Sequence, residues 1–124
     1  MSCLRRSLKE IFMAADKDCI FCKIINKEIP SNIVFENEQV LAFPDINPKA
    51  KTHILIVPKE HREGLSVLKE DDVALVGKLM VSVREVAEKI NLGSFRVIIN
   101  SGSDAGQTVF HLHLHLLSPD GFMF

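Results

Sequence analysis

The stretch F-H-L-H-L-H-L-L, from Phe110 to Leu117, places a histidine at every second position with a leucine between each pair. Because successive side chains of a strand point to opposite faces, we expect the histidines on one face and the leucines on the other. The rise of about 3.3 Å per residue puts His111 and His115 about 13 Å apart. That span excludes one metal ion bound by all three histidines. Three interpretations follow. Two adjacent histidines could be ligands in a metal site, the three could form a catalytic row, or the segment could be a half-exposed amphipathic strand.

The rest of the chain predicts a sheet with one long helix. Short segments with the composition of strands are residues 33–36, 40–43, 53–57 and 95–100. Residues 70–90 repeat apolar side chains at helical spacing, and residues 19–28 fit a short helix that ends before Pro30. Short strands joined by tight loops, with the long helix late in the order, predict an α+β domain with an antiparallel sheet.

Bulk composition narrows the function classes. The 124 residues fit one domain, and the formal net charge of −1 gives no basic character that would favour a nucleic-acid partner. No apolar run approaches the roughly 20 residues that span a bilayer. The three cysteines, an odd number, do not suggest a secreted disulfide framework, so we expect a cytoplasmic protein.

Residues 1–17 mix basic and apolar side chains ahead of the predicted domain at residues 18–124. This composition fits either an organelle-targeting peptide or a short surface helix. The segment carries Glu10 and has no hydrophobic core of the signal-peptide kind. We therefore expect a short surface helix or a flexible extension.

The histidine row and the loop before it fit phosphorus chemistry. A neutral imidazole is a nucleophile near pH 7, and when one ring nitrogen donates to a carbonyl the other presents its lone pair. The loop at residues 100–108 is rich in small residues, whose backbone N–H groups can surround an anion. This loop alone is a weak signal, because surface loops commonly have such composition and the G-K-[ST] ending of a P-loop is missing.

Two further features have competing interpretations. Cys19 and Cys22 have the spacing of a zinc site or of a redox pair, although no strand precedes them as a redox pair requires. Two reduced, buried cysteines are the plain alternative. Asp45, in P-D-I-N-P, could cap a turn or accept hydrogen bonds from the vicinal hydroxyls of a ribose.

Several collinear motifs are similar to one family. H-L-H-L-H-L-L resembles the signature of the histidine triad (HIT) superfamily. The segments C-I-F-C-K-I-I-N-K-E-I-P, T-H-I-L-I-V-P-K-E-H and G-S-D-A-G-Q-T-V-F look like its Hint branch. The resemblance implies a HIT-like fold with a five-stranded antiparallel sheet, one long and one short helix, and a homodimer that joins two sheets into one of ten strands. It also implies hydrolysis of purine nucleoside 5′-phosphoramidates to AMP or GMP and an amine.

The resemblance also assigns roles to individual residues. His113 is implied as the nucleophile that forms a nucleotidyl-histidine intermediate, His111 as the residue that orients it, and His115 as a phosphate contact. His53 matches a position near the leaving group. Thr108 stands where many relatives carry serine and keeps the hydroxyl. The implied nucleotide-binding residues are Phe21, Ile29, Asp45, Ile46, Asn100, Gly106, Gln107, Thr108, His113 and His115.

In Hint relatives with the Cys-x-x-Cys motif, the resemblance adds His61 and His111 to Cys19 and Cys22 as ligands of a structural zinc ion. The metal is expected to stabilise the fold and not to take part in the chemistry. Other activities of the superfamily are dinucleoside polyphosphate hydrolysis and adenylate removal from nucleic-acid ends. A nucleotide-binding scaffold protein with residual hydrolysis is an alternative from a different class.

Overall fold

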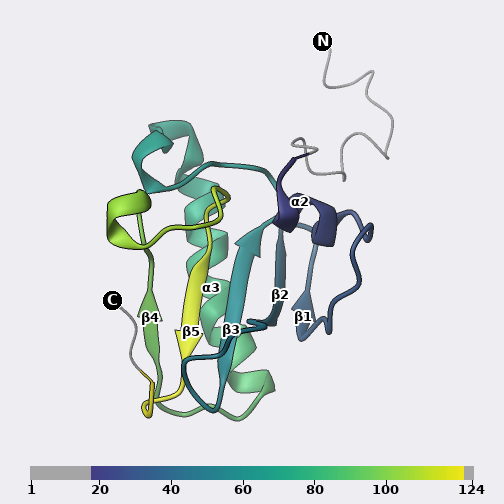
Figure 1. The fold of residues 1–124 in the computed structure, drawn as a ribbon, viewed down its shortest axis with the longest axis vertical. Helices are drawn as coiled ribbons and strands as arrows, with labels where there is room; N and C mark the ends of the chain where they lie inside the picture. The colour runs from purple at the N-terminus through teal and green to yellow at the C-terminus, as the bar shows by residue number, and fades with distance from the viewer. Residues whose placement is uncertain (1–17, 122–124) are drawn as a thin grey trace.

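The computed structural model describes residues 18–121, so the expectation for residues 1–17 lies outside the described residues. One antiparallel sheet contains all the strands of this part of the chain (Figure 1). The strands are β1 (Phe35–Glu36), β2 (Val40–Pro44), β3 (His53–Pro58), β4 (Arg96–Ile98) and β5 (Leu114–Leu117). The helices are α2 (Ile20–Ile25) and α3 (Val73–Lys89), with 3-10 turns at Leu65–Val67, Glu70–Asp72 and Ser103–Ala105. The predicted α+β class with one long and one short helix is confirmed.

The strand order is β1-β2-β3-β5-β4, so the last strand in sequence lies between two earlier ones. In this register His53 pairs with Leu117, and His115 pairs with Leu55 on one side and Ile98 on the other. The strand that ends the histidine segment, β5, is therefore an inner strand with a neighbour on each side. Every strand is joined to its neighbour in the antiparallel sense.

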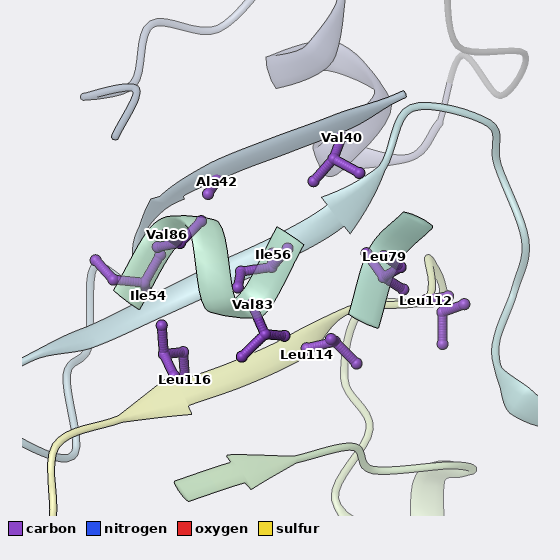
Figure 2. Close-up of a cluster of buried hydrophobic side chains, with 10 residues drawn as sticks. All are labelled: Val40, Ala42, Ile54, Ile56, Leu79, Val83, Val86, Leu112, Leu114 and Leu116. Carbon is purple, nitrogen blue, oxygen red and sulfur yellow. The ribbon is translucent and has the colours of Figure 1, made fainter. Parts of the chain in front are cut away.

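Both faces of the sheet are covered, by different elements. Alternate residues of β2 and β3 belong to two separate apolar clusters, because side chains of a strand point to opposite sides. One cluster packs under α3, which lies across the sheet in Figure 1, and Figure 2 shows its side chains converging between helix and strands. Its members are Val40, Ala42, Ile54, Ile56, Leu79, Val83, Val86, Leu112, Leu114 and Leu116. The other packs under α2 and consists of Cys19, Phe21, Cys22, Ile24, Ile25, Leu41, Phe43, Leu55 and Val57.

The long helix differs from its predicted bounds at the start. Residues 70–72 form a 3-10 turn, and the α-helix begins at Val73. The Asp72 carboxylate accepts from the backbone N–H of Lys69 and from Arg62, which holds this turn in place ahead of the helix. The helix ends at Lys89, and Asn91 then adopts a left-handed conformation that asparagine tolerates.

The histidine strand is shorter than predicted, since β5 begins at Leu114 and not at residue 111. Pro58, which ends the partner strand β3, has no N–H to continue the ladder. The imidazole of His111 takes the carbonyl oxygen of Pro58 instead, at 2.7 Å from Nε2. Leu112 meanwhile donates to the carbonyl of Arg62. Strands 33–36 and 95–100 are likewise shortened to β1 and β4.

No helix within residues 18–121 has the length and apolar character needed to cross a membrane.

Candidate functional site

The three triad histidines lie on the α2 face of the sheet, and the leucines between them lie on the α3 face. His111, His113 and His115 have exposed fractions of only 0%, 7% and 6%. The alternation predicted from residues 110–117 is confirmed, but the half-exposed strand is wrong because both faces are buried. Phe21 of α2 packs edge-on against His113, with ring centroids 5.1 Å apart.

Hydrogen bonding fixes which nitrogen of His113 carries the proton. Its Nδ1 lies 2.6 Å from the carbonyl oxygen of His111. A carbonyl can only accept, so Nδ1 carries the hydrogen and Nε2 presents a lone pair. Burial lowers the pKa of His113, which keeps the ring neutral at pH 7. A buried, neutral imidazole with an oriented lone pair is suited to nucleophilic attack.

The same reasoning fixes the tautomers of His53 and His115. The backbone N–H of Lys49 donates to Nδ1 of His53 at 3.0 Å, so the proton of a neutral His53 is on Nε2. That Nε2 lies 2.9 Å from Nδ1 of His115, which must accept. His115 therefore carries its proton on Nε2. Burial, followed by the nearby His113 and His53, lowers the pKa of His115 to about 4, so it acts as a neutral N–H donor near pH 7.

Asp45 lies beside His53 and His115, and it also caps a turn, which is one of the two roles predicted for it. Its Oδ1 accepts from the backbone N–H of Asn47 at 2.8 Å, which closes a short turn after β2. Its Oδ2 lies 3.5 Å from Nε2 of His53. Burial lowers the pKa of His53 more than the carboxylate of Asp45 raises it.

A cavity of about 320 Å³ opens in front of His113 and His115. Seven of the predicted nucleotide-binding residues line it: Phe21, Ile29, Asp45, Ile46, Thr108, His113 and His115. Apolar side chains from α2, β2 and β3 form most of the remaining wall, with Ser31 and Asn47 as further polar groups. A mostly apolar wall with a few polar groups is typical of sites that bind small organic ligands.

Three of the predicted nucleotide-binding residues, Asn100, Gly106 and Gln107, are not among the residues lining this cavity. Gln107 is buried, and its amide accepts from the backbone N–H of Gly102 and donates to the carbonyl of Glu63. Gly106 ends a 3-10 turn with φ 94°, a conformation that favours glycine. These residues shape the loop that carries Thr108.

Behind the cavity, the four predicted metal ligands converge. One ligand atom from each of Cys19, Cys22, His61 and His111 lies within 4.8 Å of all the others. Nδ1 of His111 is 3.3 Å from Sγ of Cys19 and 3.1 Å from Nδ1 of His61, and Nδ1 of His61 is 3.3 Å from Sγ of Cys22. Neighbouring ligands of a tetrahedral zinc ion are about 3.3–3.8 Å apart. The donor set fits zinc, and all three distances lie within about 0.2 Å of that range.

The hydrogen bond on the far side of His111 supports this fit. Its Nε2 donates to the carbonyl of Pro58, so Nδ1 presents a lone pair toward the two cysteines. Cys19 and Cys22 are buried and form no disulfide. Cys19 also caps α2, because its Sγ accepts from the backbone N–H of Cys22. The redox-pair interpretation lacks its βαβ context, since α2 precedes every strand described.

Two groups of the site were missed in the sequence. The backbone N–H of Lys49 and the backbone carbonyl of Pro58 set the tautomers of His53 and His111. Every residue except proline carries both groups, so no residue type in the sequence marks them.

Comparison with known proteins agrees with the fold. Residues 18–123 match the family described as "Scavenger mRNA decapping enzyme C-term binding". An uncharacterized HIT-like protein of Synechocystis sp. is 49% identical over 107 residues, which cover 86% of this chain and 94% of that protein. A 14 kDa zinc-binding protein of Zea mays is 48% identical over 105 residues, 82% of each chain. The structure of a HIT family hydrolase from Clostridium thermocellum superposes with a TM-score of 0.81 at 42% identity, covering 88% of this chain and 94% of that one. The chain therefore belongs to the histidine triad (HIT) family.

Proposed function

We propose that this protein hydrolyses purine nucleoside 5′-phosphoramidates of the adenosine 5′-monophosphoramidate type. The observation that carries the proposal is the orientation of His113, whose Nε2 lone pair is set by the hydrogen bond from Nδ1 to the carbonyl of His111. The family resemblance supports the substrate class, and a relative from Clostridium thermocellum is described as a HIT family hydrolase. The largely apolar cavity beside His113 supports a nucleoside with its base against Phe21, Ile29 and Ile46.

The proposed reaction has two steps at the α-phosphorus. Nε2 of His113 attacks, a nitrogen–phosphorus bond forms, and the bond from phosphorus to the amine breaks. The departing amine takes up one proton from solvent. Water then attacks the phosphorus of the nucleotidyl-histidine, the bond from phosphorus to His113 breaks, one proton returns to solvent, and the nucleoside monophosphate is released. His115 donates from Nε2 to a phosphoryl oxygen, and the hydroxyl of Thr108, which also lines the cavity, is a second proposed phosphate contact.

Asp45 is proposed to accept hydrogen bonds from the ribose hydroxyls, because it lines the cavity. Gly106 and Gln107 stay proposed phosphate contacts through their backbone, and Asn100 stays a proposed residue of the nucleotide pocket. A structural zinc ion is proposed at Cys19, Cys22, His61 and His111; the Zea mays relative is named a zinc-binding protein. When bound, the metal would supply rigidity by holding α2 to the triad segment.

A homodimer is proposed through β4, which is an edge strand of the sheet. Antiparallel pairing of two β4 strands along this edge would join the sheets into one of ten strands. Phe95, just before β4, is exposed and apolar. The molecular mass in solution, from light scattering, tests this. A cytoplasmic location is proposed because Cys19 and Cys22 form no disulfide, which is typical of proteins in a reducing compartment.

The central test is covalent labelling. Adenosine 5′-monophosphoramidate is added to the protein, and intact-mass spectrometry measures adenylated protein while chromatography measures AMP. We expect His113→Ala to remove the adduct and to lower turnover by at least about 10⁴-fold. Calorimetry with AMP should still detect binding by this variant, which shows that the cavity is intact. Normal turnover by the variant would refute the mechanism, and faster hydrolysis of diadenosine polyphosphates would favour the alternative activity.

A further inference from the structure

A turn that follows β5, from Ser118 to Gly121, holds the loop between β2 and β3. The Ser118 hydroxyl accepts from the backbone N–H of Thr52 at 3.1 Å, and the Ser118 N–H donates to the Thr52 carbonyl at 3.0 Å. The Asp120 carboxylate accepts from the backbone N–H of Lys51 at 2.9 Å and from the Ser118 hydroxyl. We call residues 118–121 the C-terminal clasp. It lies with the loop at the lower end of the sheet in Figure 1.

Packing adds to these hydrogen bonds. A Cβ atom placed on Gly121 would lie 2.4 Å from Cβ of Ala50 and 2.6 Å from the carbonyl oxygen of Lys49. The clasp can therefore approach Lys49 and Ala50 this closely only with glycine at position 121. The bonds from Ser118 and from the Lys51 amide lower the pKa of Asp120, so the carboxylate stays an acceptor near pH 7.

The held loop contains the amide that sets the histidine pair. Lys49 donates from its backbone N–H to Nδ1 of His53, and His53 donates from Nε2 to Nδ1 of His115. If the Lys49 N–H moves away, Nδ1 of His53 can take the proton. Nε2 of His53 then has no proton to donate, and His115 is free to adopt the other tautomer.

We propose that Ser118 and Asp120 are positioning residues that act through the Lys49 amide to keep His115 protonated on Nε2. Hydrogen bonds from the clasp fix residues 51 and 52, contact with Gly121 fixes residues 49 and 50, and the Lys49 N–H then selects one tautomer in each of the two histidines. This deepens the proposed function, because the role of His115 as donor to a phosphoryl oxygen rests on it.

The first test does not need a substrate. Nitrogen-15 NMR of histidine side chains distinguishes protonation on Nδ1 from protonation on Nε2. We expect His53 and His115 to be single Nε2–H tautomers in the wild-type protein and mixtures in Asp120→Ala. Gly121→Ala, which pushes the loop from the other side, should give mixtures too. Lys51→Ala is the matched control, since the hydrogen bond from this residue to Asp120 comes from its backbone N–H, which the variant keeps.

The second test measures hydrolysis. Asp120→Ala should lower kcat by about 5- to 10-fold with KM within about twofold, because one hydrogen bond to the reacting phosphoryl group is weakened. Asp120→Asn, whose amide oxygen still accepts from the Lys51 N–H, should restore most of the loss. When sulfur replaces the phosphoryl oxygen of the substrate that His115 contacts, kcat of the wild-type protein should fall by a larger factor than kcat of Asp120→Ala.

The outcomes separate the two proposals. If the wild-type protein hydrolyses no phosphoramidate, the proposed function fails, and the NMR comparison still decides the role of the clasp. Unchanged tautomers in both Asp120→Ala and Gly121→Ala would overturn the clasp proposal. It would equally be overturned if Lys51→Ala shifted the tautomers as much as Asp120→Ala. Asp120 is exposed, and Asp120→Asn keeps the side-chain shape and one acceptor oxygen for the Lys51 N–H, so at least one variant at this position is expected to fold.

Discussion

Two clusters of potential metal ligands lie on the same face of the sheet, and their hydrogen bonds separate them. The cysteine cluster is Cys19, Cys22, His61 and His111, and the carboxylate cluster is Asp45, His53 and His115. In both, the ligand atoms lie within 4.8 Å of one another. Proximity and residue type alone would therefore assign a metal to each.

The direction of the hydrogen bond on the far side of the imidazole distinguishes the two clusters. His111 donates from Nε2 to the carbonyl of Pro58, which leaves the lone pair of Nδ1 for a metal. His53 accepts a backbone N–H at its other nitrogen, so its inward nitrogen carries a proton that points at His115. A metal in the carboxylate cluster would have to displace that proton and break the bond to Lys49. The cysteine cluster thus suits a metal, and the carboxylate cluster suits a hydrogen-bond chain.

The largest difference between the two clusters should appear when one histidine of each cluster is replaced by alanine. His115→Ala is expected to lower kcat by about 10²- to 10⁴-fold, because the donor to the phosphoryl group is lost. The bound zinc and the melting temperature should stay close to those of the wild type. His61→Ala should show the reverse pattern, with zinc lost and the smaller effect on turnover per folded molecule. Steady-state kinetics and metal analysis of both variants measure this; loss of zinc in His115→Ala would contradict the division.

Removing the metal from the cysteine cluster should mainly lower stability. Cys22→Ser is expected to lower Tm by about 10 °C or more, because the free energy of metal binding contributes to folding. Thermal unfolding with and without a chelator gives the control. The chelator should lower the wild-type Tm to near that of Cys22→Ser and should leave the variant unchanged. Equal melting of the wild-type protein in both conditions would argue against a structural metal.

Counting bound metal tests the comparison directly. We expect one zinc ion per chain by native mass spectrometry at near-stoichiometric zinc, and none in a Cys19→Ser, Cys22→Ser double variant. A second ion of similar affinity that disappears in His53→Ala would show that the carboxylate cluster also binds metal. In that case the tautomers assigned to His53 and His115 would be incorrect.

Lowering the pH should decrease the free energy of unfolding by a smaller amount, through the histidines of the carboxylate cluster. Burial lowers the pKa values of His53 and His115, the latter to about 4, whereas an exposed histidine titrates near 6.5. Between those values the unfolded chain binds more protons than the folded one, so the free energy of unfolding falls as pH decreases from about 6.5 to about 4. Urea unfolding at pH 7 and pH 5 measures the decrease. It should be smaller in His115→Asn, and an identical decrease would contradict the assignment.

The part of this molecule that the sequence could predict follows from side-chain pattern. Alternation in residues 110–117 placed histidines and leucines on opposite faces, and the spacing of Cys19 and Cys22 indicated two possible ligands, to which only the family resemblance added His61 and His111. Burial of both faces was not evident, because the covering helix α2 has only six residues and contributes little periodic signal. The roles of backbone groups, such as the carbonyl of Pro58, could not be predicted, because every residue has a backbone carbonyl and the residue type does not mark its role.

The position of β5 in the sheet also has a consequence for folding kinetics. Leu117 pairs with His53, which lies 64 positions earlier in the chain. Pairings between such distant residues form slowly, because a long loop must close before any contact rewards it. The helical signal of α3 can return early, since its hydrogen bonds are local. The histidines on both sides of the pairing meet only when β5 inserts beside β3. During refolding, catalytic activity should therefore return with the slowest phase and report completion of the sheet.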